Sequence, residues 1–138
     1  MGWPFYAFLS AAASALTAIL AKIGVENVPT SAVVVFRTLV VLVLTSIVAV
    51  SLGDHRALTH VSRRSLLFLT LSGLATGVAW LAYFRALQLG PASRVAPIDK
   101  LSLPLAIVLA GFVLNETITW KVALGVLLMT LGALLTIA

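Results

Sequence analysis

Five long apolar runs, separated by short connections, constrain this chain more than any other feature of its sequence. A helix needs about 20 mostly apolar residues, at about 1.5 Å each, to cross about 30 Å of hydrocarbon. The runs predict spans at residues 5–21, 31–52, 66–87, 95–115 and 120–138. Because only helices satisfy their own backbone within so short a segment of lipid, we expect an all-α integral membrane protein of about five transmembrane helices.

Composition excludes a soluble alternative. Hydrophobic residues make up 62% of the chain and charged residues only 9%, whereas soluble domains carry roughly 25% charged residues. A single core in a chain of this size could not bury the apolar excess. The expected partner of this surface is therefore the lipid bilayer.

Several other classes of function lack support. The net charge is +5, but the basic residues are scattered singly and form no stripe that could follow a nucleic-acid backbone. The chain has no cysteine, and His55 and His60 lie five residues apart in a loop, which is a poor metal site. No phosphate loop, zinc signature or nucleophile elbow is present. We expect no enzyme, no metal and no cofactor.

Short connections predict one compact unit. They lie at residues 24–30, 53–65, 90–93 and 116–119, which leaves no room for an extramembrane domain, so residues 1–138 are expected to form a single domain. The N-terminal run carries no basic start and has no Ala-x-Ala-like exit before Lys22. We interpret it as a retained span rather than a signal peptide.

The loop cations do not select an orientation. One side would hold Arg56, Arg63, Arg64 and Lys121, and the other would hold Lys22, Arg37, Arg85, Arg94 and Lys100. Such a balance is expected of a protein that inserts in both directions, and two opposed copies of an odd-span chain form an inverted repeat. Alternatively, the exposed cluster of Arg56, Arg63 and Arg64 fixes one orientation.

An ordered set of motifs gives the chain a family resemblance. The set comprises Ser72-Gly73-Leu74-Ala75-Thr76-Gly77, Trp80, Tyr83, Arg85-Ala86-Leu87, Gly90, the stretch from Val95 to Ser102, Leu114-Asn115-Glu116, and Gly125 to Gly132. In order and spacing the chain resembles a single EamA-type unit of the drug/metabolite transporter superfamily, over essentially its whole length.

The resemblance implies an architecture and a role. Members usually have two such units in tandem, giving ten spans around a substrate path, so a one-unit chain is expected to be half of a ten-helix inverted-repeat transporter, completed by a homodimer of opposite topology. An export role and a place in the cell's inner membrane are also implied. The related small multidrug-resistance proteins have a glutamate in the first span. No acid lies there in this chain, which argues against their proton-coupled export of lipophilic cations.

The fourth span is expected to draw charges into the membrane. Its uncharged part, residues 101–115, reaches only about 22 Å, so the helix must include Asp99 and Lys100. Charges at depth tend to face a cavity or a partner, and Pro97 and Pro104 free backbone carbonyls beside them. Consecutive residues project about 100° apart in a helix, so these two need not pair. The alternative is that Lys100 snorkels while Asp99 caps the helix start.

The third span carries an aromatic stripe. Gly73, Gly77, Trp80 and Phe84 share one helical face, with Tyr83 adjacent, and the rings are candidate walls of a solute slot. Plain packing or a membrane belt is the alternative. Arg37, within the second span, has no partner nearby in sequence, so it either snorkels or meets an anion supplied by protein or substrate.

The fifth span carries a candidate dimer face. Gly125 and Gly132 are one heptad apart and admit close helix approach. They resemble the family's dimer-facing pattern, and packing within the same chain is the alternative.

Two functions compete on these features. The first is a passive or secondary transporter of small polar metabolites, such as amino acids or related compounds, which would use Asp99, Lys100, Trp80, Tyr83, Phe84 and Arg37 to bind its solute. The second is a non-transporting membrane scaffold or accessory subunit of a lipid-flipping complex, which would need no inward charges.

Overall fold

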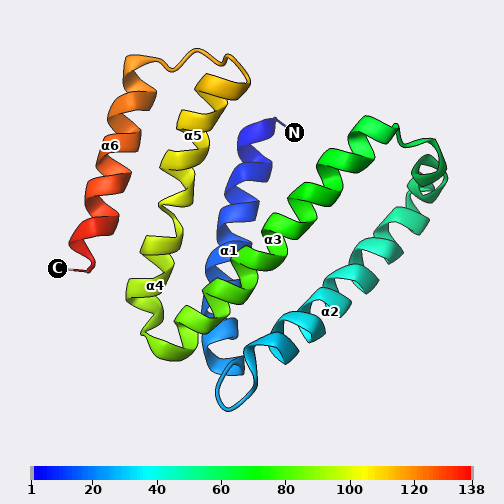
Figure 1. Cartoon of the computed structure of the whole chain (residues 1–138), viewed down its shortest axis with the longest axis horizontal. Helices are drawn as coiled ribbons and strands as arrows, with labels where there is room; N and C mark the ends of the chain where they lie inside the picture. Colours follow the sequence, from blue (N-terminus) through cyan, green and yellow to red (C-terminus); the bar gives the residue numbers. More distant parts are fainter. Residues whose placement is uncertain (1, 138) are drawn as a thin grey trace. The chain divides into compact units, whose positions relative to one another are not determined.

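The computed structural model describes residues 2–137, and of residues 58–60 the backbone alone. Within that range the chain is helical throughout and contains no strand (Figure 1). The elements are α1 (Trp3–Gly24), α2 (Thr30–Ser51), the 3₁₀ helix η1 (Asp54–His60), α3 (Arg63–Leu89), α4 (Ala92–Asp99), α5 (Ser102–Val113) and α6 (Trp120–Leu135).

Most of these helices are long and apolar enough to cross a membrane. Four segments of the described chain meet that standard: α1 with 22 residues, α2 with 22, α3 with 27, and the combined segment Ala92–Val113 with 22. Helix α6 is apolar but shorter, at 16 residues, or about 24 Å. The prediction of an all-helical membrane protein with about five apolar helices is confirmed.

The chain divides into two compact units, which we describe separately. The central unit comprises residues 21–88, and the terminal unit comprises residues 1–20 with 89–138. Helix α1 therefore begins in the terminal unit and ends in the central one. All of α2 and η1 belongs to the central unit, together with almost the whole of α3.

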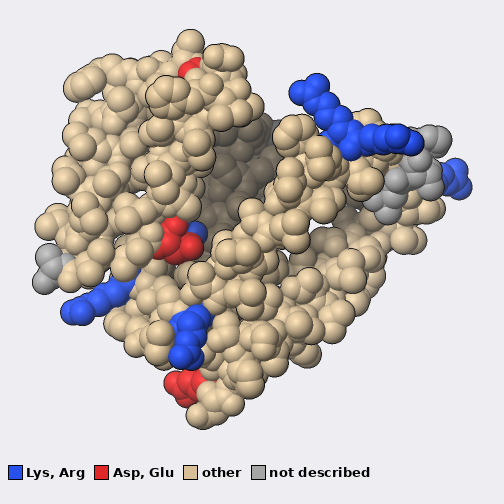
Figure 2. Space-filling model, in the orientation of Figure 1, with Lys and Arg blue, Asp and Glu red and all other residues tan. Residues whose placement is uncertain are grey.

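The helices have almost no core of their own. Val25, Phe84 and Leu87 are the largest fully buried side chains among the described residues, at 1%, 1% and 0% exposure. Neither α1 nor α2 buries a single residue. Figure 2 shows a surface that is mostly uncharged, with Lys and Arg gathered over η1 and the start of α3. Such an apolar surface requires lipid or protein to cover it.

Within the central unit, α2 and α3 run antiparallel and are joined through η1 (Figure 1). Gly53 follows α2 with φ at 76°, a left-handed conformation that glycine adopts at little cost. Ser62 then caps α3, because its Oγ accepts from the Ser65 amide at 3.1 Å. The sequence predicted only a loop at residues 53–65, and the structure adds a 3₁₀ helix there and begins α3 at Arg63.

Within the terminal unit, the predicted fourth span is interrupted. Pro104 has no N–H to give the Lys100 carbonyl, which instead accepts from the Leu103 amide at 3.0 Å, three residues on. Helix α4 consequently ends at Asp99 and α5 begins at Ser102. A turn follows α5 through Asn115, whose φ is 54°. Thr119 caps α6 by accepting from the Val122 amide at 3.4 Å.

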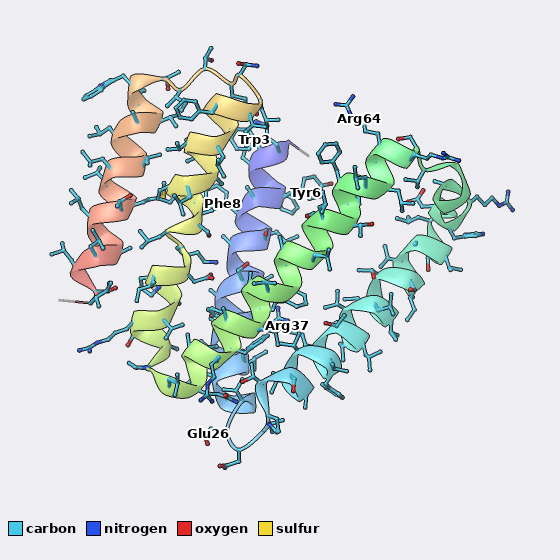
Figure 3. The ribbon with its side chains drawn as sticks, viewed as in Figure 1. Trp3, Tyr6, Phe8, Glu26, Arg37 and Arg64 are labelled. Atoms are coloured by element: carbon cyan, nitrogen blue, oxygen red, sulfur yellow. The ribbon has the colours of Figure 1, made fainter. Side chains whose placement is uncertain are left out.

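Aromatic side chains mark the start of α1. Trp3, Tyr6 and Phe8 are 82%, 60% and 77% exposed and lie along the first turns of the helix (Figure 3). Trp120, also in the terminal unit, begins α6 and is 75% exposed. Tryptophan and tyrosine concentrate at membrane interfaces, where an apolar ring meets a polar headgroup layer. We interpret these residues as an interfacial belt.

Candidate functional site

The central unit holds a cation against aromatic rings. The guanidinium carbon of Arg37, on α2, lies 4.9 Å from the Trp80 ring centroid and 5.3 Å from that of Phe84, both on α3. Figure 3 shows Arg37 where α2 and α3 approach one another. These distances are within the range in which a cation is attracted by the negative face of an aromatic ring.

The rings that receive Arg37 are themselves held in place. Phe84 is 1% exposed, and its ring meets that of Tyr83 edge-on at 5.7 Å. Trp80 and Phe84 are four residues apart, which places them on one face of α3. The aromatic surface is therefore a firm part of the helix pair, whereas the Arg37 side chain is only half-buried.

Arg37 lies well inside its span. It follows the first residue of α2 by seven positions, which corresponds to about 10 Å along the axis. Insertion scales place the cost of an arginine at the centre of a span at about 2.5–3.5 kcal/mol. A partly desolvated cation–π contact returns about 1–2 kcal/mol, so the rings offset much of the cost of burying this charge.

The same face of α3 continues into a polar region. Leu87 and Gln88 follow Phe84 by three and four residues, so they extend its stripe by one turn. Lys22, from the end of α1, donates to the Leu87 carbonyl at 2.6 Å. A cation is stabilised at this position because the carbonyl end of a helix carries partial negative charge.

Gln88 ties the α1–α2 turn to the end of α3. Its Nε2 donates to the carbonyls of Val25 and Val28 at 3.2 and 2.7 Å. Its Oε1 accepts from Thr30 Oγ1 at 2.8 Å and from Arg85 Nη1 at 3.2 Å. The amide thus uses both of its functions, and it fixes the turn that leads into the helix carrying Arg37.

The terminal unit holds a second charged group. Asp99 and Lys100 form an ion pair, with Lys100 Nζ 3.4 Å from Asp99 Oδ2. Their side chains are 40% and 55% exposed. Their spacing did not predict this pairing, because a regular helix separates consecutive side chains by about 100°. Lys100 instead lies in the turn after α4, with ψ at −7°, and there the two side chains can meet.

The sequence-predicted site residues therefore fall into two groups. Arg37, Trp80 and Phe84 form one cluster with Tyr83 beside it, and Asp99 and Lys100 form an ion pair in the other unit. Their roles in binding a solute stay predictions. Among the described residues, no three His, Cys, Asp or Glu side chains gather as metal ligands.

The predicted dimer glycines have open surroundings. A Cβ built on Gly125 or on Gly132 would meet no atom of the described residues within 4 Å. By contrast, a Cβ on Gly111 would lie 2.7 Å from the Ile118 side chain. Gly111 thus has a close neighbour within the terminal unit, whereas Gly125 and Gly132 have none among the described residues.

Sequence reasoning missed Gln88 as an organising residue. A single glutamine near the end of an apolar helix resembles an ordinary interfacial residue. The available signal was its position, since Gln88 follows Trp80 by eight residues and Phe84 by four on the stripe already singled out.

A chain of several lipid-length apolar helices, with an arginine held inside one of them by rings of another, defines a polytopic helical membrane protein. The match to known proteins then gives the family. Residues 1–138 match the model of the EamA-like transporter family, and the chain belongs to that family. It is a multi-pass membrane transporter.

One curated relative supports this membership. The chain is 44% identical, over 133 residues, to a Sinorhizobium protein described as an uncharacterized transporter in the cobO 3′ region. The match covers 96% of this chain and 94% of the relative. No solved structure matches the chain significantly.

Proposed function

We propose that the protein exports small polar metabolites, such as amino acids or related compounds, across the cell's inner membrane without a nucleotide energy source. The observation that carries this proposal is Arg37. A scaffold helix has no use for an arginine about 10 Å inside its span. A solute path does, because a charge at depth gives a polar solute something to bind in an otherwise apolar slot.

The aromatic rings suit the same task. Trp80 and Phe84 hold the Arg37 guanidinium from one side, so the charge is positioned before a solute arrives. Preorganised groups bind more tightly because less side-chain freedom is lost on binding. Tyr83, adjacent to Phe84, adds a polar edge to the wall of the slot.

Asp99 and Lys100, in the terminal unit, supply a second polar group that a solute could bind. They lie where α4 gives way to α5, and interrupted helices at the membrane midplane are a common place for transporter binding sites. Because the two charges compensate one another at 3.4 Å, the pair can stay in the membrane without a solute. A zwitterion could insert between them.

We further propose that the working unit is an antiparallel homodimer. The chain spans 94% of its Sinorhizobium relative, so that transporter has the same single-unit size. The near-equal cation counts of the two membrane sides favour both insertions. The open surroundings of Gly125 and Gly132 leave a face of α6 for close approach by a second copy.

The function is tested by solute counterflow in proteoliposomes. Vesicles loaded with an unlabelled solute should accumulate the labelled form only when the protein is present, for at least one member of a panel of amino acids and related metabolites. Arg37→Gln should lower the initial rate at least tenfold. Arg64→Gln, at the exposed start of α3, is the matched control and should keep the wild-type rate.

A uniformly negative panel, with the protein inserted and dimeric, would refute the transport proposal. A membrane scaffold or accessory subunit of a lipid-flipping complex would then be the better account, and Arg37 would be a packing residue.

A further inference from the structure

Two cations of the central unit reach one face of α3. Trp80, Phe84, Leu87 and Gln88 are spaced by four, three and one residues, so they share a stripe. Arg37 reaches this stripe from α2, and Lys22 reaches the next turn from α1. Two positive charges from two helices therefore serve a single helix face.

Arg37 has no carboxylate partner among the described residues of the central unit. The described acids of the central unit are Glu26 and Asp54. Asp54 begins η1, at the far end of α2, and Glu26 is exposed and lies on the outside of the α1–α2 turn (Figure 3). The ion pair of Lys100 with Asp99 lies in the other unit. The positive charge of Arg37 is therefore not paired with either carboxylate of the central unit.

The mode of contact leaves the binding edge of Arg37 available. A guanidinium is planar, and its five N–H donors point outward in that plane. The Trp80 and Phe84 rings attract the positive charge of the guanidinium, and this contact uses none of its N–H groups as hydrogen-bond donors. Among the described residues no carboxylate or carbonyl accepts a hydrogen bond from the Arg37 side chain. A fork of this shape fits two oxygens of a carboxylate.

We infer that the solute is recognised through a carboxylate held by the Arg37 fork, and that an amino group on it is dispensable at this site; the inference rests on the proposed function. The stripe contains no acid that could receive an ammonium group, and its two main rings already hold Arg37. A simple monocarboxylate should therefore bind there, whereas the corresponding amine should not.

Binding can be measured apart from transport. The chain has 3 tryptophans, so Trp3→Phe with Trp120→Phe leaves Trp80 as the single indole, in direct contact with Arg37. Its emission is followed in a phosphate-free maltoside detergent, which removes lipid phosphate as a competing anion. The probes are acetate, 4-methylpentanoate, phenylacetate and leucine, each with its amide, together with isoamylamine.

The expected result is a saturable change in Trp80 emission with at least one acid that lacks an amino group, at about 10- to 100-fold lower concentration than its amide, the range expected of hydrogen bonds to a charged group. Isoamylamine should give no saturable change. Arg37→Gln should remove the preference for acid over amide, and Arg37→Lys, which keeps the charge without the fork, should restore part of it.

Three results would overturn the inference: equal binding of acids and amides, retention of the preference in Arg37→Gln, or no response to any acid. A fourth, tighter binding of leucine alone with no response to 4-methylpentanoate, would show that the amino group is required and overturn that part. Saturable acid binding without counterflow would leave the inference standing and refute the transport proposal. Counterflow at equal rates for an acid and for its amide would instead overturn the inference and leave the transport proposal standing.

Discussion

Replacing Gln88 by leucine should loosen the central unit more than any other single polar change. Leucine keeps the approximate volume but removes four hydrogen bonds, two of them partly buried and two exposed. Taking about 1 kcal/mol for each partly buried bond and about 0.5 kcal/mol for each exposed one, the free energy of unfolding should fall by about 3 kcal/mol. The carbonyls of Val25 and Val28 would also lose their donor.

Reversible unfolding in mixed detergent micelles, titrated with dodecyl sulfate and followed by helix content, measures this change. Thr45→Val is the matched control, because the Thr45 hydroxyl donates only within its own helix, to the carbonyls of Val41 and Leu42. Its loss should cost less than about 0.5 kcal/mol. Thr30→Val removes one of the four bonds and should cost about 1 kcal/mol.

Gln88→Glu separates the two halves of the amide. Glutamate still accepts from Thr30 and Arg85 but cannot donate to the turn carbonyls, so its destabilisation should come from the lost donors. If Gln88→Leu unfolds at the same detergent fraction as Thr45→Val, the turn is not held by Gln88, and the reasoning about this region is wrong.

Three further predictions concern assembly, charge pairing and orientation. Gly125→Leu or Gly132→Leu should shift dimer to monomer in mild detergent with little loss of monomer helix stability, since an added Cβ meets nothing among the described residues. Gly111→Leu should instead destabilise the monomer by displacing its close neighbour. A dimer that is unchanged in Gly125→Leu and Gly132→Leu would place the interface elsewhere. Asp99→Asn or Lys100→Met alone should lower both counterflow and membrane insertion. The double variant should insert better than either single variant, because a lone charge in a span costs about 2.5–3.5 kcal/mol. Additive insertion defects would mean that the ion pair contributes nothing to insertion. Reporter fusions at the C-terminus should signal from both sides of the membrane, and extra lysines in one connection should select one side. A signal from one side alone in the unaltered protein would remove the charge-balance argument for the antiparallel dimer.

The helices follow closely from the sequence because the bilayer leaves few alternatives. Apolar runs of lipid length must be helical to satisfy their backbone, so composition and length decide the fold class without tertiary detail. The interruption of the fourth span is also readable, since Pro104 lacks the donor that the Lys100 carbonyl needs. The pairing of Asp99 with Lys100 is not, because it depends on the turn conformation at Lys100.

The candidate site was only partly accessible in the same way. The stripe of Trp80 and Phe84 is a helical periodicity, which the sequence displays. Its contact with Arg37 depends on the register and spacing of α2 against α3, and no local pattern encodes those. Gln88 was overlooked for the same reason, since two of its partners are backbone carbonyls of the α1–α2 turn. Every residue has a backbone carbonyl, so the residue types of the turn do not indicate these contacts.

Thiol labelling tests most directly whether the Arg37 face lines a path for solutes. The chain has no cysteine, so each introduced thiol is unique. Trp80→Cys lies on the face that Arg37 contacts, and Val78→Cys lies about 3 Å away along the axis of α3 but about 160° around it, where Val78 is 69% exposed. With a membrane-impermeant maleimide in sealed vesicles, the proposed transporter requires labelling at position 80, protection by the transported solute, and no labelling at position 78. Absence of labelling at position 80, or equal labelling of both positions without protection, would contradict a solute path along this face.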